Sequence, residues 1–367
     1  MTNPLGLYIH IPFCAKKCNY CDFYSLAPNG DAKRHYINRI CEELTKWGGQ
    51  TVRPIDTVYI GGGTPSLLSE DELDRILSSV KASFTLQDDA EITCEINPGD
   101  NAEVFLSYAA KHGVNRISVG VQSANEDELK MLGRRHSFAD AQKAVSAARK
   151  AGINNISADI MIGLPGSTAD TLQNSIDKIL SLSTEHLSAY ILKLEQGTPF
   201  FKDGVILPDE DATADQYLMM CKAFERAGYE HYEISNFAKR GFQSRHNNKY
   251  WLCEEYIGIG PAAHSFFEGK RFYYPRSLED FLESGHTLPD GSGGDKDEYI
   301  MLALRLSRGL KFKELWERFG TAVSPKFIEK AKFFEKQGLL TVNDTGISLT
   351  DEGMLLSNAV ISALINL

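Results

Sequence analysis

Short apolar runs alternate with amphipathic stretches over the first 240 residues of the chain. The apolar runs contain few polar residues, which predicts strands that are buried on both faces. Several amphipathic stretches begin at a residue that favours the N-cap, such as Ser69, and end at a glycine, such as Gly113 or Gly152. The predicted strands are 7–11, 57–61, 91–96, 116–121, 156–163, 187–192 and 232–235, and the predicted helices are 31–47, 69–81, 101–112, 138–151, 168–181 and 210–227.

This alternation of strands and helices predicts an α/β fold with a parallel sheet covered by helices. In such folds the chemistry is found at the carboxyl ends of the strands. Most of the unusual polar residues and cysteines of this chain come directly after a predicted strand. We therefore expect a functional site along that edge of the sheet.

The pattern changes after residue 240. The segment 241–290 is rich in aromatic residues, Gly and His, and the run 288–297 is expected to be a flexible connection. Three short helices (295–306, 311–319 and 325–337), a hairpin over 339–350 and a final helix are expected beyond it. We therefore predict a barrel domain over 1–240, a connecting segment over 241–290 and a small winged-helix-like domain over 291–367.

Charge and hydropathy narrow the functional classes. The chain has 367 residues and a formal net charge of −10. Residues 291–367 contain ten Lys or Arg and ten Asp or Glu, so this winged-helix-like domain lacks the basic surface of a nucleic-acid reader. The N-terminus lacks the pattern of a signal peptide, and no run approaches the roughly 20 apolar residues of a membrane span. We expect a cytoplasmic protein that reaches a membrane only through partners.

Three of the seven cysteines, Cys14, Cys18 and Cys21, lie within eight residues after the first predicted strand. Three thiolates with this C-x3-C-x2-C spacing can hold three irons of a [4Fe–4S] cluster. The alternatives are inert thiols or a structural zinc site. Zinc normally requires four ligands, which only Asp22 or His10 could complete here. The four scattered cysteines are expected to be small buried hydrophobes.

The cysteine motif and the run from Gly61 to Pro65, which follows the second predicted strand, resemble the radical SAM superfamily. This resemblance implies a [4Fe–4S] cluster and S-adenosylmethionine (SAM), which binds the iron without a protein ligand. Glycines after a strand also let the backbone approach a ligand closely. Asp159 interrupts an otherwise apolar strand, where an acidic group is costly unless it is paired or bound to a ligand.

The whole chain resembles the oxygen-independent coproporphyrinogen III oxidase-like family. The resemblance implies an open, partial (β/α)6 TIM-like barrel with a small, mainly helical winged-helix-like C-terminal domain. It also implies sites for two SAM molecules. The first would contact Tyr8, Gly62 and Glu95, and the second Tyr20, Gly63, Thr64, Gln122, Arg134 and Asp159, with Arg135 as the alternative to Arg134.

Two departures from the oxidases indicate the heme chaperone branch of this family, called HemW. The oxidases have a fourth cysteine where this chain has Phe23, and they carry an extension before the cluster strand, whereas this chain begins 13 residues before Cys14. The run from His246 to Trp251 matches the H-N-x-x-Y-W motif of the branch. This resemblance implies heme as ligand and a hemoprotein as acceptor, which we expect to be a respiratory enzyme of a membrane.

The candidate heme residues follow from this motif and the segment after it. Histidine is the commonest axial donor to heme iron, and aromatic side chains offer flat apolar faces to a macrocycle. The alternatives are a packed aromatic loop in which His246 caps backbone, oxidative decarboxylation of coproporphyrinogen III, and another radical SAM reaction. No catalytic residue is assigned, and the oligomeric state stays open. The heme candidates are His246, Asn247, Tyr250, Trp251 and His264.

Overall fold

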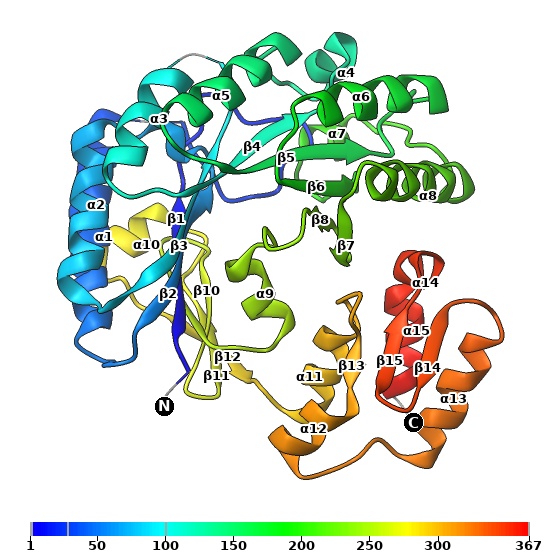
Figure 1. Cartoon of the computed structure of the whole chain (residues 1–367). Coiled ribbons are helices and arrows are strands. Elements are labelled where there is room, and N and C mark those ends of the chain that lie inside the picture. The colour runs from blue at the N-terminus through cyan, green and yellow to red at the C-terminus, as the bar shows by residue number, and fades with distance from the viewer. Residues whose placement is uncertain (1–2, 28, 100, 366–367) are drawn as a thin grey trace.

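The computed structural model describes residues 3–27, 29–99 and 101–365. Its main element is a 12-stranded sheet in the order β12-β11-β10-β9-β1-β2-β3-β4-β5-β6-β8-β7. The first six strands of the chain lie side by side and parallel, and they curve into an open barrel (Figure 1). They are β1 (Leu5–Ile11), β2 (Ile55–Gly62), β3 (Leu86–Ile96), β4 (Arg116–Gln122), β5 (Asn155–Ile162) and β6 (His186–Ile191). The predicted partial (β/α)6 barrel is confirmed.

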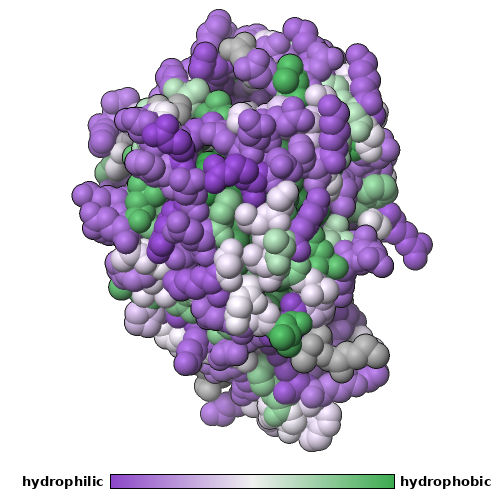
Figure 2. Space-filling view, turned by 90° about the vertical axis from the view of Figure 1, so that its left-hand side faces the viewer, coloured by the Kyte–Doolittle hydropathy of each residue, from purple (hydrophilic) through white to green (hydrophobic). Residues whose placement is uncertain are grey.

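Helices cover the outer face of these strands. Capping boxes at Ser69, Ser137 and Thr168 fix the starts of α2, α5 and α6, because each satisfies backbone N–H groups of the first turn. The face formed by α1 and α2 is mostly hydrophilic and has only small apolar groups (Figure 2). The covering elements are α1 (Gly30–Gly48), the 3-10 turn Pro65–Leu67, α2 (Glu70–Ser83), α3 (Ala102–Lys111), α4 (Glu126–Met131), α5 (Phe138–Lys150), α6 (Ala169–Ser181), α7 (Pro199–Lys202) and α8 (Glu210–Arg226).

Additional strands extend both edges of the parallel sheet. Beside β1 lie β9 (Tyr256–Ile259), which is parallel to it, and the antiparallel β10 (His264–Phe267), β11 (Lys270–Tyr273) and β12 (Leu288–Ser292). Beside β6 lie β8 (Asn236–Ala238) and β7 (Glu230–Glu233). Two short helices, α9 (Arg245–Trp251) and α10 (Leu278–Glu283), interrupt this part of the chain.

Two expectations for this part of the chain are corrected. The run 288–297 is not simply a flexible connection, because Leu288 and Pro289 pair with β11 and extend the sheet. An edge strand tolerates Pro. The Gly and Asp residues of this run are typical of loops, so the sequence did not reveal the strand. The predicted strand 232–235 is placed too far along the chain, because its first two residues end β7 at Glu233 and its last two form the turn before β8 begins at Asn236.

The C-terminal region contains a three-stranded sheet in the order β13-β15-β14, and its hydrophobic core also includes Tyr256 of β9 and Phe266 of β10. The predicted hairpin is confirmed as β14 and β15, and the last helix buries Val360, Ile361 and Leu364. Within the described part of the chain, no helix is both long and apolar enough to cross a membrane. The elements are α11 (Lys296–Ala303), β13 (Leu310–Lys311), α12 (Phe312–Phe319), α13 (Pro325–Glu335), β14 (Leu340–Asn343), β15 (Gly346–Leu349), α14 (Asp351–Leu355) and α15 (Ser357–Ile365).

Candidate cofactor site

A cavity of about 610 Å³ opens at the carboxyl ends of the parallel strands. Its size falls in the range of about 300–1,000 Å³ that is usual for small-molecule sites. The cluster and SAM candidates line it with one exception, Tyr8, whose hydroxyl instead bonds to His10 Nδ1 at 2.9 Å. The candidates on the wall are Cys14, Cys18, Tyr20, Cys21, Gly62, Gly63, Thr64, Glu95, Gln122, Arg134 and Asp159.

The three cysteines lie on the loop after β1. Backbone hydrogen bonds hold this loop in place, from Cys14 N to Leu26 O at 2.9 Å and from Asn19 N to Leu132 O at 3.1 Å. Two donors outside the loop reach the sulfurs. Thr64 Oγ1 lies 3.4 Å from Cys14 Sγ, and Arg134 Nη1 lies 3.4 Å from Cys18 Sγ. Such donors stabilise sulfur that carries negative charge, as thiolates on iron do.

The side chains around the loop favour an iron–sulfur cluster over a single zinc ion. The sulfurs of Cys14, Cys18 and Cys21 do not all lie within 4.8 Å of one another. Thiolates on one tetrahedral zinc would be about 3.8 Å apart. The side chains that could complete a zinc site have other partners, since both ring nitrogens of His10 are hydrogen-bonded and Asp22 pairs with Arg276. Three thiols around a roomy cavity fit a [4Fe–4S] cluster with one open iron.

The glycine run at the end of β2 brings backbone against the cysteine loop. Gly62 has a φ of +110°, and a Cβ atom there would lie 2.4 Å from His10 Nδ1. A Cβ atom on Gly63 would lie 2.7 Å from the carbonyl oxygen of Phe13. Neither position therefore has room for a side chain, and both glycines are required by this packing.

Glu95 connects this glycine run with the barrel interior. Its Oε2 accepts a hydrogen bond from Gly62 N at 3.0 Å, and its Oε1 accepts one from the Tyr59 hydroxyl at 2.9 Å. Burial raises the pKa of Glu95 to about 7, against the opposing effect of these two hydrogen bonds. The carboxyl group therefore changes its charge near neutral pH and faces a cavity that would hold a cationic ligand.

Arg134 is the central group of a second set of polar side chains on the cavity wall. Besides Cys18, its guanidinium donates to Asn97 Oδ1 at 2.8 Å and to the carbonyl of Gly120 at 2.5 Å. Asp159 accepts a hydrogen bond from Ser118 Oγ at 2.9 Å, and burial raises the pKa of its carboxyl group. Polar groups of both signs thus converge on this half of the cavity, which suits a ligand that carries both charges.

Several wall residues were not predicted. Asn97 lies two residues beyond Glu95, so the two-residue period of a strand places both on the same face and could have identified it. By the same rule, Tyr190 on β6 lies on the same face of its strand as the polar Ser188, which could have identified Tyr190 as a wall residue. Phe23, two residues after Cys21, lies at the cavity with 68 % of its surface exposed, so an apolar ring and not a fourth thiol stands at this position.

The H-N-x-x-Y-W motif forms α9, which packs against the opposite end of the barrel from the cysteines. His246 is 1 % exposed, and its ring nitrogens lie 2.9 Å from Thr57 Oγ1 and 2.8 Å from the Tyr250 hydroxyl. Burial, with a smaller effect of Lys249, lowers the pKa of His246 to about 3. Lys249 is itself buried and lies 2.9 Å from Asp56. In this arrangement the His246 ring is neutral, and both of its nitrogens already have partners.

His264 has a different setting. It begins β10 near the end of β9, which runs parallel to β1, so it lies toward the same edge of the sheet as the cysteine loop. Its side chain is 59 % exposed, stacks on Tyr273 with ring centroids 5.1 Å apart, and points Nδ1 toward Asp290 at 3.8 Å. One nitrogen thus faces a carboxylate, and the side chain is open to solvent.

Comparison with known proteins places this geometry in a family. Residues 8–179 match the model of the radical SAM superfamily, and residues 297–356 match the HemN C-terminal domain. Heme chaperone HemW from Lactococcus lactis is 34% identical, covering 98% of this chain and 97% of that protein. Heme chaperone HemW from Escherichia coli is 36% identical, with the same coverage of both chains.

The chain belongs to the HemW family of radical SAM proteins. Membership implies the [4Fe–4S] cluster and SAM, for which the cysteine loop and the cavity are the fitting site. When bound, the cluster supplies an electron and an open iron to SAM. A solved structure of coproporphyrinogen III oxidase (HemN) from Escherichia coli has a TM-score of 0.85 at 21% identity, covering 98% of this chain and 90% of that one. That likeness shows that the two proteins share a fold.

Proposed function

We propose that this protein is a heme chaperone, which binds heme and transfers it to an acceptor hemoprotein. The observation that carries the proposal is likeness over essentially the full length to proteins named heme chaperone, at 34% and 36% identity. The exposed Phe23 in place of a fourth cysteine supports the same assignment. The finer proposal is that the acceptor is a respiratory hemoprotein of a membrane.

We propose that the cluster and SAM occupy the cavity. Cys14, Cys18 and Cys21 hold three irons, and the polar groups on either side of them bind SAM. The first SAM molecule is assigned to the Glu95 side, where the backbone N–H of Gly62 holds the Glu95 carboxylate at the wall. A second molecule would lie on the Arg134 side, where Asp159 and Gln122 complete the wall. The chain's own residues then orient the ligand and exclude water from it.

For heme we propose His264 as the axial ligand. Its side chain is exposed, so Nε2 can offer a lone pair to iron, while Nδ1 faces the Asp290 carboxylate at 3.8 Å and Tyr273 fixes the orientation of the ring. The buried His246 acts as a positioning residue: its ring lies against Tyr59, with centroids 5.2 Å apart, and Tyr59 holds Glu95. The motif thereby supports Glu95, which belongs to the part of the cavity wall assigned to the first SAM molecule.

The alternative is oxidative decarboxylation of coproporphyrinogen III, since the solved coproporphyrinogen III oxidase shares the fold of this chain. A transfer assay tests the chaperone proposal directly. Cluster-loaded protein is charged with heme, freed of excess heme, and mixed with an apo-hemoprotein. We expect the heme absorption band to shift from that of the donor to that of the acceptor. A chain that takes up no heme, or never releases it, would not be a chaperone.

A further inference from the structure

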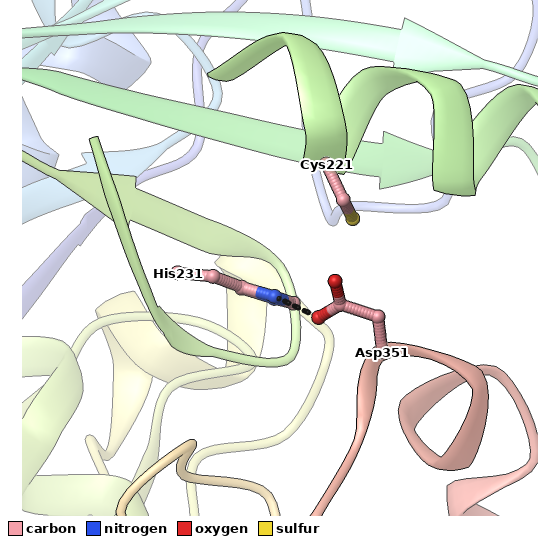
Figure 3. A group of neighbouring side chains, drawn as sticks. All are labelled: Cys221, His231 and Asp351. Carbon is pink, nitrogen blue, oxygen red and sulfur yellow. Dashed lines mark hydrogen bonds and ion pairs between the residues drawn. The ribbon is translucent and has the colours of Figure 1, made fainter. Parts of the chain in front are cut away.

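A second set of potential metal ligands lies where the barrel meets the C-terminal region, remote from the cysteine loop. Cys221 on α8, His231 on β7 and Asp351 at the start of α14 point toward one another (Figure 3). One ligand atom from each lies within 4.8 Å of the other two. Among the described residues, this is the one group of three or more His, Cys, Asp or Glu side chains that meets this distance criterion.

The three side chains are shielded and already in contact. Cys221 is fully buried, the His231 side chain is 5% exposed, and the Asp351 side chain is 30% exposed. His231 Nδ1 lies 2.8 Å from Asp351 Oδ1. The ring of His231 is also held from the side, because it stacks on Phe237 with centroids 4.2 Å apart. The imidazole is therefore fixed with Nδ1 toward the other two ligand atoms.

We propose that Cys221, His231 and Asp351 form a binding site for a divalent transition-metal ion of the zinc type. A thiolate, an imidazole nitrogen and a carboxylate oxygen are the ligands that Zn²⁺ prefers, and a water would complete the tetrahedron. Ligand atoms on such an ion are about 3.3–3.8 Å apart, so closing on an ion requires only small shifts from the present positions.

The proton balance of binding is simple. The Cys221 thiol loses its proton to solvent and binds as a thiolate. His231 gives up to solvent the Nδ1 proton that faces Asp351 and takes one from solvent on Nε2, so its proton count is unchanged and Nδ1 binds through its lone pair. The Tyr217 hydroxyl lies 3.5 Å from that Nε2 and can accept the proton's hydrogen bond, as outer partners of metal-bound histidines do. Asp351 exchanges its hydrogen bond with Nδ1 for a bond to the ion. One thiolate and one carboxylate then neutralise the two positive charges of the ion.

The site lies between two parts of the chain, so a bound ion would stabilise their arrangement. Cys221 and His231 belong to the barrel, whereas Asp351 begins a helix of the C-terminal region, and the ion would join the two parts. Because an ion that binds only the native arrangement stabilises it, occupancy raises the unfolding midpoint of the protein. The site uses no residue of the cysteine loop, so it can be filled or empty independently of the cluster.

The test uses full-length protein with its cluster reconstituted anaerobically and with loose metal removed by a chelator. It is equilibrated with micromolar Zn²⁺, and zinc and iron per chain are measured together. We expect about one zinc per chain with no loss of iron, and zinc X-ray absorption showing one sulfur at about 2.3 Å and nitrogen or oxygen at about 2.0–2.1 Å.

Matched variants locate the ion. Cys221→Ser and Asp351→Asn should each weaken zinc binding at least about tenfold, because each removes one of three protein ligands. Cys253→Ser is the control: Cys253 is also buried and lies 3.9 Å from a carboxylate, that of Glu298. It should bind zinc like the parent protein. Any of three outcomes would overturn the proposal. These are zinc uptake matched by an equal loss of iron, no zinc uptake by the parent protein, and equal zinc binding by all three variants.

Discussion

Glu95 Oε2 accepts a hydrogen bond from the backbone N–H of Gly62 at 3.0 Å, and this bond joins the end of β3 to the glycine run at the end of β2. Two of the three residues that we propose for the first SAM molecule are thus bound to each other. Through Tyr59, which donates to the other carboxylate oxygen, the same unit reaches His246 at the far end of the barrel. A series of contacts therefore connects the cavity wall at Gly62 and Glu95 with His246 of the H-N-x-x-Y-W motif.

The charge of Glu95 makes SAM binding depend on pH. Its pKa is raised to about 7, so the carboxyl group is protonated below that pH and ionised above it. Because the sulfonium of SAM is positive, the ionised form binds it better. The apparent association constant should therefore fall as pH drops below about 7, by up to about tenfold per unit. Calorimetric titration at several pH values measures this, and Glu95→Gln should flatten the profile.

The same shift has a consequence for stability. The ordinary pKa is 4.5 and the folded value is about 7, so the folded protein holds this proton more tightly than the unfolded chain. This group therefore lowers the free energy of unfolding as pH rises from about 4.5 to about 7. Glu95→Gln should remove this decrease in the free energy of unfolding. Denaturant unfolding of both proteins between about pH 4.5 and about pH 7 measures the difference. An identical pH dependence in the two would contradict the assignment.

Adding a methyl group at Gly63 should disrupt the cofactor site. The new carbon would lie 2.7 Å from the carbonyl oxygen of Phe13 and push the glycine run away from the cysteine loop. We expect Gly63→Ala to lose most of its SAM binding. Gly30→Ala is the control, because an added carbon there meets no atom within 4 Å. Equal SAM affinity in the two variants, measured on cluster-loaded protein, would show that the close approach is unimportant.

The cysteine triad should be the sole protein source of cluster ligands. Cys18→Ala should reduce iron to a small fraction of the parent content and abolish the absorbance at about 400 nm. Cys41→Ser changes a thiol that contacts the Arg75 carbonyl on the helical face and should leave both signals unchanged. Survival of iron and absorbance in Cys18→Ala would refute the cluster assignment.

The two candidate histidines should give different phenotypes. His264→Ala should weaken heme binding about tenfold or more while the fold stays intact, because an exposed side chain is removed. His246→Ala removes a buried ring with two hydrogen-bonding partners and should destabilise the protein by about 2–4 kcal/mol. Heme titration and denaturant unfolding separate the two effects. Unchanged heme affinity in His264→Ala, with a loss in a still-folded His246→Ala, would instead make His246 the ligand.

The sequence was most informative where the signal is local. The spacing of Cys14, Cys18 and Cys21 and the glycine run are contiguous, and Asp159 stands out because its strand is otherwise apolar. The surroundings of His246 could not be predicted, because its partner Thr57 is 189 residues away. The helix α9 has seven residues, which is too short to show helical periodicity. Likewise, β12 is recognisable only through the strand beside it.

The assignment as a heme chaperone is tested most directly by two assays on one anaerobic, cluster-loaded preparation. One follows heme binding and transfer to an apo-hemoprotein, and the other follows conversion of coproporphyrinogen III in the presence of SAM and an electron donor. We expect a stable heme complex that passes heme to the acceptor, without formation of protoporphyrinogen. Efficient formation of protoporphyrinogen by a chain that holds no heme would contradict it.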